Sequence, residues 1–274
     1  MRAFQIEMFS DSGAILRIAI FFGLLILFAT AERFWPRRAN PLRATRWPTN
    51  IGLSLVNTAL LRLVLALVPG AAVLAAYLGD DQGLLAAVGL SGLGACVVGF
   101  LLLDLAVYAQ HRLFHIVPVL WRVHRVHHAD IEFDVTTGIR FHPIEMVISQ
   151  CWKIAVVLII GVPVISVLVF EIVLNASSMF SHSNLRLPEP VDRVLRLFIV
   201  TPEMHRVHHS TEVSEMNTNY GFNFSLWDRL FGSYLQATHL DQAVMPIGLP
   251  EWRNPKVLTF GWSLKFPFVS GPSA

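Results

Sequence analysis

The chain has 274 residues, of which 54% are hydrophobic and 15% charged, and its formal net charge is +2. Ordinary soluble domains carry about a quarter charged residues, so this composition indicates a membrane protein, and the small net charge does not favour nucleic-acid binding. The chain has two cysteines and no CxxC motif, so a disulfide framework is not expected. Any metal chemistry must therefore rest on histidine and carboxylate side chains.

Long apolar runs dominate the N-terminal part of the chain. The first covers residues 13–31, which is close to the roughly 20 residues that a membrane-spanning helix needs. A basic, proline-containing connector at 32–48 follows it, and a second apolar run covers 51–78. After the short loop 79–83, a third run extends over 84–109. We expect each of these three runs to form a transmembrane helix.

Charge asymmetry predicts how these helices are oriented. The loop after the second run carries only Asp80 and Asp81, whereas the connector carries five arginines: Arg33, Arg37, Arg38, Arg43 and Arg46. Cytoplasmic loops of membrane proteins are enriched in Lys and Arg. The connector is therefore predicted to be cytoplasmic and the acidic loop to lie outside. The third run then returns to the cytoplasm and delivers His111 there.

A further apolar stretch covers 146–180 and is interrupted by GVP at 161–163. We expect two short helices in a hairpin, either fully spanning or re-entrant, which returns His142 and His182 to the same side of the membrane. The segment 187–200 that follows is amphipathic and typical of an interfacial helix. The predicted fold class is thus all-α, a multi-pass membrane protein.

The histidines form three boxes. The pentapeptide HRVHH occurs at 124–128 and again at 205–209, and HRLFH occupies 111–115. On a helix, residues three and four apart share one face, so the rings of each box converge. Neutral imidazole suits zinc, copper, iron and nickel. We predict that these boxes bind metal through eight rings: His111, His115, His124, His127, His128, His205, His208 and His209.

Eight imidazoles exceed the three or four protein ligands of a typical zinc site, so two adjacent metals use the set economically. His142 and His182 are candidates for a ninth and a tenth ligand, with an ordinary polar contact as the alternative. Asp104 lies in an apolar run and on the helical face of His111, so it is a candidate to orient a ligand ring, or else a helix-packing residue. The isolated His239 is not expected to be a ligand.

The ordered segments HRLFH, WRVHRVHH, RFHPIE, FSHSNLRLP and EMHRVHHS, followed by NTNYGFNFSLWDRLFGSY, resemble the fatty acid hydroxylase superfamily, and its sterol desaturase-like members in particular. The resemblance implies about four transmembrane helices beneath a cytosolic histidine-rich helical cap. It also implies two iron ions held by the eight box histidines, O2 as co-substrate, and hydroxylation or desaturation of a sterol, fatty acyl or ether lipid. A separate cytochrome b5 or ferredoxin would donate electrons.

The same resemblance suggests a division of the chain into N-terminal helices with the basic connector (1–83), a catalytic region (84–240) and a C-terminal tail (241–274). The C-terminal letters SGPSA contain no retrieval signal, which favours a bacterial inner membrane over the endoplasmic reticulum.

Three other functions remain open at this stage. A histidine-rich metal transporter would place its ligands within the membrane, and a bis-histidine haem protein would leave most of the histidines unexplained. A zinc-dependent membrane hydrolase would need a carboxylate near the histidines, for which Asp130, Glu132 and Glu145 are available.

Overall fold

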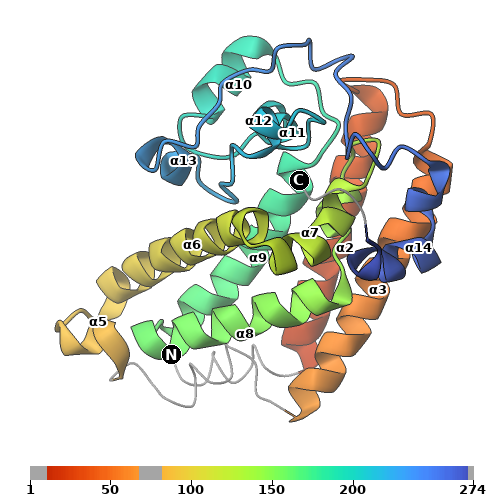
Figure 1. The fold of residues 1–274 in the computed structure, drawn as a ribbon. Helices are drawn as coiled ribbons and strands as arrows, with labels where there is room; N and C mark the ends of the chain where they lie inside the picture. The colour runs from red at the N-terminus through yellow and green to blue at the C-terminus, as the bar shows by residue number, and fades with distance from the viewer. Residues whose placement is uncertain (1–10, 68–81, 271–274) are drawn as a thin grey trace.

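The computed structural model describes residues 11–67 and 82–270, and within these ranges all regular secondary structure is helical. Five long helices form one end of the molecule, and short helices and loops form a cap at the other (Figure 1). The acidic loop with Asp80 and Asp81, the last part of the predicted second run and the final four residues lie outside the described residues. The prediction of an all-α protein is confirmed.

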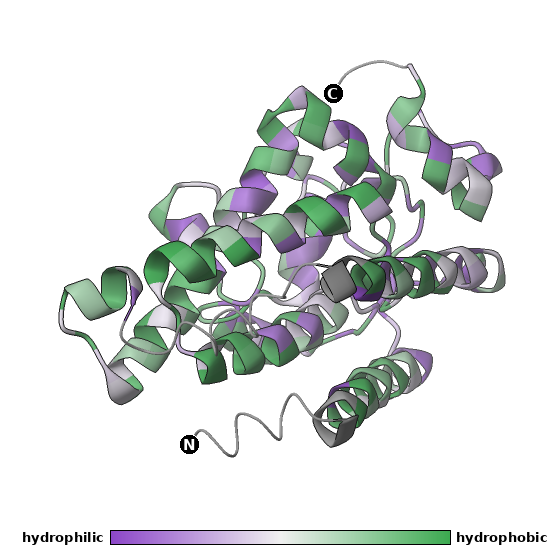
Figure 2. Ribbon diagram, turned by 90° about the horizontal axis from the view of Figure 1, so that it is seen from below, coloured by the Kyte–Doolittle hydropathy of each residue, from purple (hydrophilic) through white to green (hydrophobic). Residues whose placement is uncertain are grey.

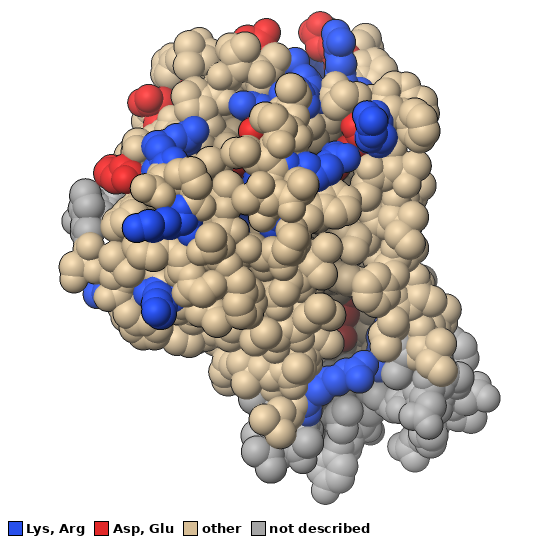
Figure 3. Space-filling model, turned by 90° about the vertical axis from the view of Figure 1, so that its right-hand side faces the viewer, with Lys and Arg blue, Asp and Glu red and all other residues tan. Residues whose placement is uncertain are grey.

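The long helices are α2 (Asp11–Phe34), α3 (Arg43–Leu67), α6 (Gly92–Ile116), α8 (Pro143–Ile160) and α9 (Val164–Ser181). Four segments of the described chain are long and apolar enough to cross a membrane: Ile15–Phe34 and the helices α6, α8 and α9. Their ribbons are mainly hydrophobic in Figure 2. In Figure 3 most charged side chains lie over the upper part of the visible face, and the lower part is mostly uncharged. This distribution is that of an integral membrane protein with a polar cap.

The predicted hairpin is present as α8 and α9. The turn between them places Gly161 in the left-handed region (φ 72°), where its N–H donates to the carbonyl of Val157. A Cβ on Gly161 would lie 1.8 Å from the carbonyl oxygen of Gln82, so only glycine fits this close approach. Lys153 and Glu171 form an ion pair of 2.6 Å between the two helices, which offsets the cost of charge at this depth.

The predicted third run, 84–109, is not one continuous helix. A short helix, α5 (Gly83–Ala87), ends before a break, and α6 begins at Gly92. Gly89 and Gly92 both have positive φ, 71° and 58°, which breaks the helical path although the surrounding residues are apolar. Helix α6 then extends to Ile116, seven residues beyond the predicted end, so that it carries the HRLFH box on its last turns.

The cap contains the helices α7 (Pro118–His128), α10 (Glu189–Leu195), α11 (Pro202–His208), α12 (Val213–Met216), α13 (Leu226–Leu230) and α14 (Phe260–Lys265). It also contains three short 3₁₀ helices: Thr137–Ile139, Pro255–Leu258 and Phe266–Phe268. In α10, within the stretch predicted to be interfacial, Val191 and Val194 are exposed. In Figure 1 the cap lies at the ends of the long helices. HRLFH is at the end of α6, and the two HRVHH repeats are on α7 and α11 of the cap.

A buried polar network joins the first part of the chain to this cap. Arg46, in the first turn of α3, donates to both oxygens of Asp130 at 2.5 and 2.6 Å and to Asp134 at 2.7 Å, and all three side chains are buried. Arg140, also buried, donates to Asn50 of α3 at 2.8 Å. Buried charges are tolerated when they are paired or hydrogen-bonded: Arg46 is paired with both aspartates, and Arg140 is hydrogen-bonded. The network joins α3 to the segment that follows α7, which carries the first HRVHH.

Candidate metal centre

Helix ends from four parts of the chain bring nine histidines together. The last turns of α6 supply His111 and His115, and α7 supplies the three rings of the first HRVHH. Helix α11, capped by the hydroxyl of Thr201, supplies the second HRVHH through its C-cap, and His182 is the C-cap of α9. Pro118 and Pro202 each occupy the first position of a helix, where the missing N–H costs nothing.

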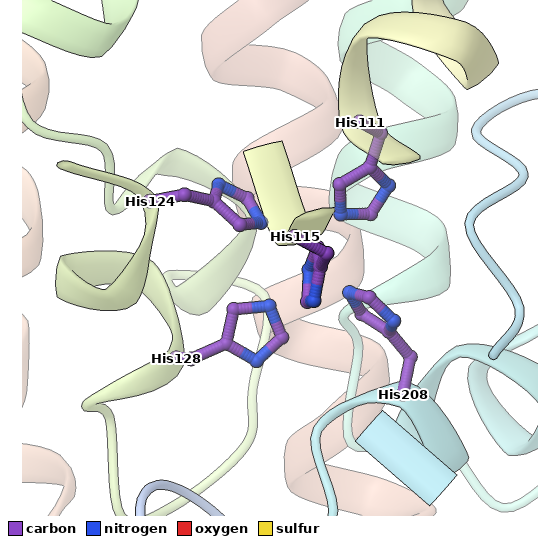
Figure 4. Close-up of side chains that lie close together, drawn as sticks. All are labelled: His111, His115, His124, His128 and His208. Atoms are coloured by element: carbon purple, nitrogen blue, oxygen red, sulfur yellow. The ribbon is translucent and has the colours of Figure 1, made fainter. Parts of the chain in front are cut away.

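The nine rings form two groups in which the possible ligand atoms all lie within 4.8 Å of one another. The five-histidine cluster contains His111, His115, His124, His128 and His208 (Figure 4). The four-histidine cluster contains His127, His182, His205 and His209. In Figure 4, His124 and His128 approach from one side and His111 and His208 from the other, with His115 between them.

Each HRVHH therefore contributes to both clusters. The first repeat gives the i and i+4 rings, His124 and His128, to the five-histidine cluster and His127 to the other. The second repeat gives His205 and His209 to the four-histidine cluster and His208 to the five-histidine cluster. The clusters adjoin, because the rings of His128 and His209 stack with their centroids 4.5 Å apart. The two repeats thus build one composite centre.

In the five-histidine cluster, hydrogen bonds to the outer nitrogen aim four of the rings inward: His111, His115, His124 and His208. The Nδ1 atoms of His111 and His208 lie 2.9 and 2.8 Å from the carbonyl oxygens of Tyr220 and Thr218. A ring that donates from Nδ1 carries its lone pair on Nε2. The Nε2 atoms of His111, His115, His124 and His208 are buried and have no hydrogen-bond partner, and His128 has none at either nitrogen.

In the four-histidine cluster, the ring nitrogens that could bind a cation face one another directly. His127 and His182 use Nδ1 against the carbonyl oxygens of Arg140 and Ser178, at 3.1 and 2.8 Å. Their Nε2 atoms then face each other at 3.0 Å with both lone pairs directed inward. His205 Nε2 lies 3.0 Å from His182 Nε2, and both nitrogens of His209 are buried without a partner. Facing lone pairs repel unless a cation lies between them, so the residues fit a metal ion.

The electrostatics of the cap also favour neutral ligands. Burial, and after it the neighbouring histidines, holds the pKa of His127, His128, His205 and His209 well below the ordinary value of 6.5. Burial lowers the pKa of His208 to about 3 and that of His182 to about 4. These rings are neutral at physiological pH. Only a neutral imidazole can bind a metal, so the environment prepares the rings for ligation.

Two of the predicted site residues lie away from both clusters. His142 is the N-cap of α8, where Nδ1 accepts from the N–H of Ile144 at 3.1 Å and Nε2 lies 3.2 Å from the carbonyl oxygen of Leu264. Asp104 accepts from the indole of Trp227 at 2.8 Å and from two backbone N–H groups, and within the described chain it bonds no histidine ring. The structure therefore brings together the eight box histidines and His182, but not His142 or Asp104.

Sequence reasoning missed most of the groups that hold the rings in place. Glu145, in the first turn of α8, lies 2.7 Å from Nδ1 of His124 and is buried. The sequence indicates this residue only as a carboxylate at the start of an apolar helix, three residues after His142. We considered Glu145 only as a possible hydrolytic acid. Asn217 lies 3.2 Å from Nδ1 of His115. The carbonyl groups that receive the other rings leave no mark in a sequence.

Comparison with known proteins agrees with this arrangement. The profile of the family described as fatty acid hydroxylase matches residues 96–233, which is about half of the chain. An ornithine lipid hydroxylase of Rhizobium tropici is 32% identical over 139 residues, which cover 50% of this chain and 41% of that protein. An alkylglycerol monooxygenase of Xenopus tropicalis is 30% identical over 138 residues, which cover 50% of this chain and 29% of that protein.

A cholesterol 25-hydroxylase of Rattus norvegicus is 26% identical over 145 residues, covering 52% of this chain and 47% of that protein. The chain spans less than half the length of these curated relatives. No solved structure matches it. The family match contains all nine clustered histidines as well as Asn217 and Glu145. On its histidine boxes, its helical fold and this match, the chain belongs to the fatty acid hydroxylase family.

Proposed function

We propose that this protein is a membrane-bound lipid oxygenase that holds two iron ions and uses O2 to hydroxylate or desaturate a C–H bond of a sterol, fatty acyl or ether lipid. The observation that carries the proposal is the pair of adjoining clusters of neutral, buried imidazoles. Each cluster supplies at least four nitrogens, enough for one metal with an open position. His142 has no place in this ligand set, because both of its nitrogens are engaged elsewhere.

Bound iron would supply the activation of O2 that breaking an unactivated C–H bond requires, which redox-inert zinc does not provide. The balanced hydroxylation joins one C–H bond, one O2, two electrons and two protons to give an alcohol and water. Desaturation uses the same electrons and O2 but removes a second hydrogen from the lipid. The names of the relatives, which are hydroxylases or monooxygenases, support hydroxylation in particular.

The role of this chain's own residues is to aim the rings and to exclude water. The outward hydrogen bonds to Glu145, Asn217 and backbone carbonyls fix the tautomers and leave Nε2 free. Phe141 stacks on His127 with the ring centroids 4.7 Å apart, and Phe133 lies 5.1 Å from His209. These aromatic walls keep the centre apolar, which suits a lipid chain and prevents side reactions with water.

The location of the centre supports a cytoplasmic site. Three of the clustered histidines lie at the ends of α6 and α9, and the other six lie on α7 and α11. Arg37 of the connector pairs with Glu203 of α11 at 2.8 Å. Because cytoplasmic segments are rich in arginine, we place the clusters on the cytoplasmic side of the membrane. The membrane that we favour is a bacterial inner membrane. The electrons would come from a separate cytochrome b5 or ferredoxin.

The rival functions have less support. A transporter would place its ligands within the spans, but the clusters lie at and beyond the helix ends. A zinc hydrolase would need a free carboxylate beside the metal. Asp130 is locked by Arg46, and Glu145 is directed at the outer nitrogen of His124. Glu132 belongs to neither histidine cluster, so none of the three supports this alternative.

Lipid mass spectrometry of cells with and without the gene is the test. We expect a lipid that gains the mass of one oxygen atom, or loses that of two hydrogens, only when the wild-type protein is present. His127→Ala and His208→Ala should abolish the product, and His239→Ala, which changes a histidine outside both clusters, should not. Purified protein that contains a single zinc and modifies lipid without O2 would refute the proposal.

A further inference from the structure

A surface pocket lies directly behind the five-histidine cluster. Its volume is about 390 Å³, and its wall includes Arg112, His115, Asn217, Thr218, Tyr220 and Phe231. We call it the His115 pocket. It is a feature of the cap that the proposed reaction does not yet use.

The His115 pocket lies on the outer side of the ligand rings. His115 is the one ring of its cluster that is not fully buried, and its Nδ1 bond to Asn217 is exposed. Nε2 of the same ring is buried and directed at the other histidines. The imidazole therefore separates the pocket from the metal side. A lipid C–H bond placed in the pocket would not reach the metal, so the pocket is not the place of oxidation.

The floor of the pocket is the segment 217–220, which also holds three of the five rings. Asn217 binds His115, and the carbonyl oxygens of Thr218 and Tyr220 receive Nδ1 of His208 and His111. A redox group seated in the pocket is thus one hydrogen bond away from three ligands of a single cluster. Because electron transfer slows steeply with distance, this segment offers a short route from the surface to the centre.

The rim of the pocket has the composition of a docking site. Ile116 and Phe231 are 59% and 47% exposed. Arg112 is exposed and makes no hydrogen bond or ion pair with the residues that the structure describes. Among the described residues of the lining, no carboxylate opposes it. An apolar centre beside arginine is typical of protein interfaces, and the uncompensated positive charge selects an acidic partner.

We propose that the His115 pocket is where an acidic electron-donor protein docks, and that electrons enter the five-histidine cluster through the segment 217–220. The inference rests on the proposed function, which consumes two electrons per turnover. Each docked, reduced donor loses one electron and the metal centre gains one. Two such transfers, with two protons from water, complete the balance of the reaction.

The first test measures binding and needs no catalysis. The full chain is loaded with zinc and placed in phosphatidylcholine nanodiscs, and the soluble domain of an acidic cytochrome b5 or an acidic ferredoxin is titrated. We expect Arg112→Glu to weaken binding of at least one donor by about tenfold or more, and Arg112→Lys to retain most of it. Arg193→Glu makes the same charge change on the exposed face of α10 and serves as the matched control.

The second test measures reduction of the iron-loaded protein in a stopped-flow instrument. Arg112→Glu should slow reduction by the donor protein but leave reduction by methyl viologen, a small cation that needs no docking, unchanged. Equal effects of Arg112→Glu and Arg193→Glu, or no binding of either donor, would overturn the inference. Arg112-dependent binding of phosphatidate vesicles without donor binding would assign the pocket to a lipid headgroup instead.

The two proposals fail separately. If binding of the donor and reduction of the centre both depend on Arg112 but no lipid is oxidised, the proposed function is wrong and the docking site stands. If lipid oxidation proceeds at the wild-type rate in Arg112→Glu with the donor protein as sole reductant, the docking site is wrong and the function stands.

Discussion

His127 and His128 are neighbours in the sequence, yet their rings are directed into different clusters, with an angle of 87° between the ring planes and 5.4 Å between the centroids. His208 and His209 repeat this relationship at 81° and 5.5 Å. Successive residues of a helix point about 100° apart, so two adjacent histidines cannot serve one metal from the same direction. An HH pair in each repeat thus places the two histidine clusters side by side.

Replacing Glu145 should weaken the metal site through His124. Glu145→Ala removes the acceptor of the His124 Nδ1 proton. Loss of such a partner typically lowers metal affinity by about 10- to 100-fold. Glu145→Gln keeps an oxygen acceptor and should retain most of the affinity. Competition with a metal chelator measures both variants. Equal affinities for Glu145→Ala and wild type would show that the ring is oriented by other groups.

His142→Ala should leave the metal content unchanged, because His142 caps α8 and lies outside both clusters. Loss of an N-cap acceptor lowers the free energy of unfolding by about 1 kcal/mol. His142→Asn, which can still accept from the N–H of Ile144, should recover part of the stability. Metal analysis together with thermal unfolding in detergent tests this. A variant that loses metal beyond the loss of its folded fraction would instead indicate ligation.

Asp104→Asn should destabilise the fold rather than the metal site. The carboxylate accepts the indole N–H of Trp227 and the backbone N–H groups of Asn223 and Phe224, so it fastens this segment to α6. Replacing one oxygen by NH2 leaves a buried donor without an acceptor, at a cost of about 1–3 kcal/mol. We expect a lower melting temperature and an unchanged ratio of metal to folded protein. Metal loss without destabilisation would contradict this role.

Metal-free protein should lose stability as the pH falls. Burial holds the pKa of His208 at about 3 and of His182 at about 4 in the folded state, whereas an unfolded histidine titrates near 6.5. Below about pH 6.5 the unfolded chain binds more protons than the folded one, so the free energy of unfolding decreases with decreasing pH. Melting temperatures of chelator-treated protein, measured from about pH 8 to about pH 5.5, should fall. A flat profile would mean that the folded and unfolded chains bind protons equally over this range, so that burial does not lower the pKa of these rings.

Most of the apolar helices and the grouping of the eight box histidines could be predicted because they depend on local patterns. Apolar runs indicate the spans, GVP indicates the turn of the hairpin, and HxxHH on a helix places its rings on one face. The break before α6 was missed because Gly89 and Gly92 stand among apolar residues that hide it. The sequence predicts Arg46 to be one of the cytoplasmic charges in the connector, but the fold buries it against Asp130 and Asp134.

The division of the histidines between clusters could not be predicted, because it depends on how α7 faces α11 across the centre. His182 joins through the return of the α8–α9 hairpin, and His142, at the opposite end of the same hairpin, does not. Both gave the same signal in the sequence: a histidine at the end of an apolar run. The backbone carbonyls of Arg140, Thr218 and Tyr220 gave none.

Metal stoichiometry of single-cluster variants tests the two-metal centre most directly. Iron-loaded full-length wild type, His128→Ala, His209→Ala and His239→Ala are compared by elemental analysis at equal folded fraction. We predict two irons per chain in the wild type and in His239→Ala, and a reduced content in His128→Ala and His209→Ala, each through its own cluster. One metal per chain in the wild type, or a full complement of two in both cluster variants, would contradict the dinuclear centre.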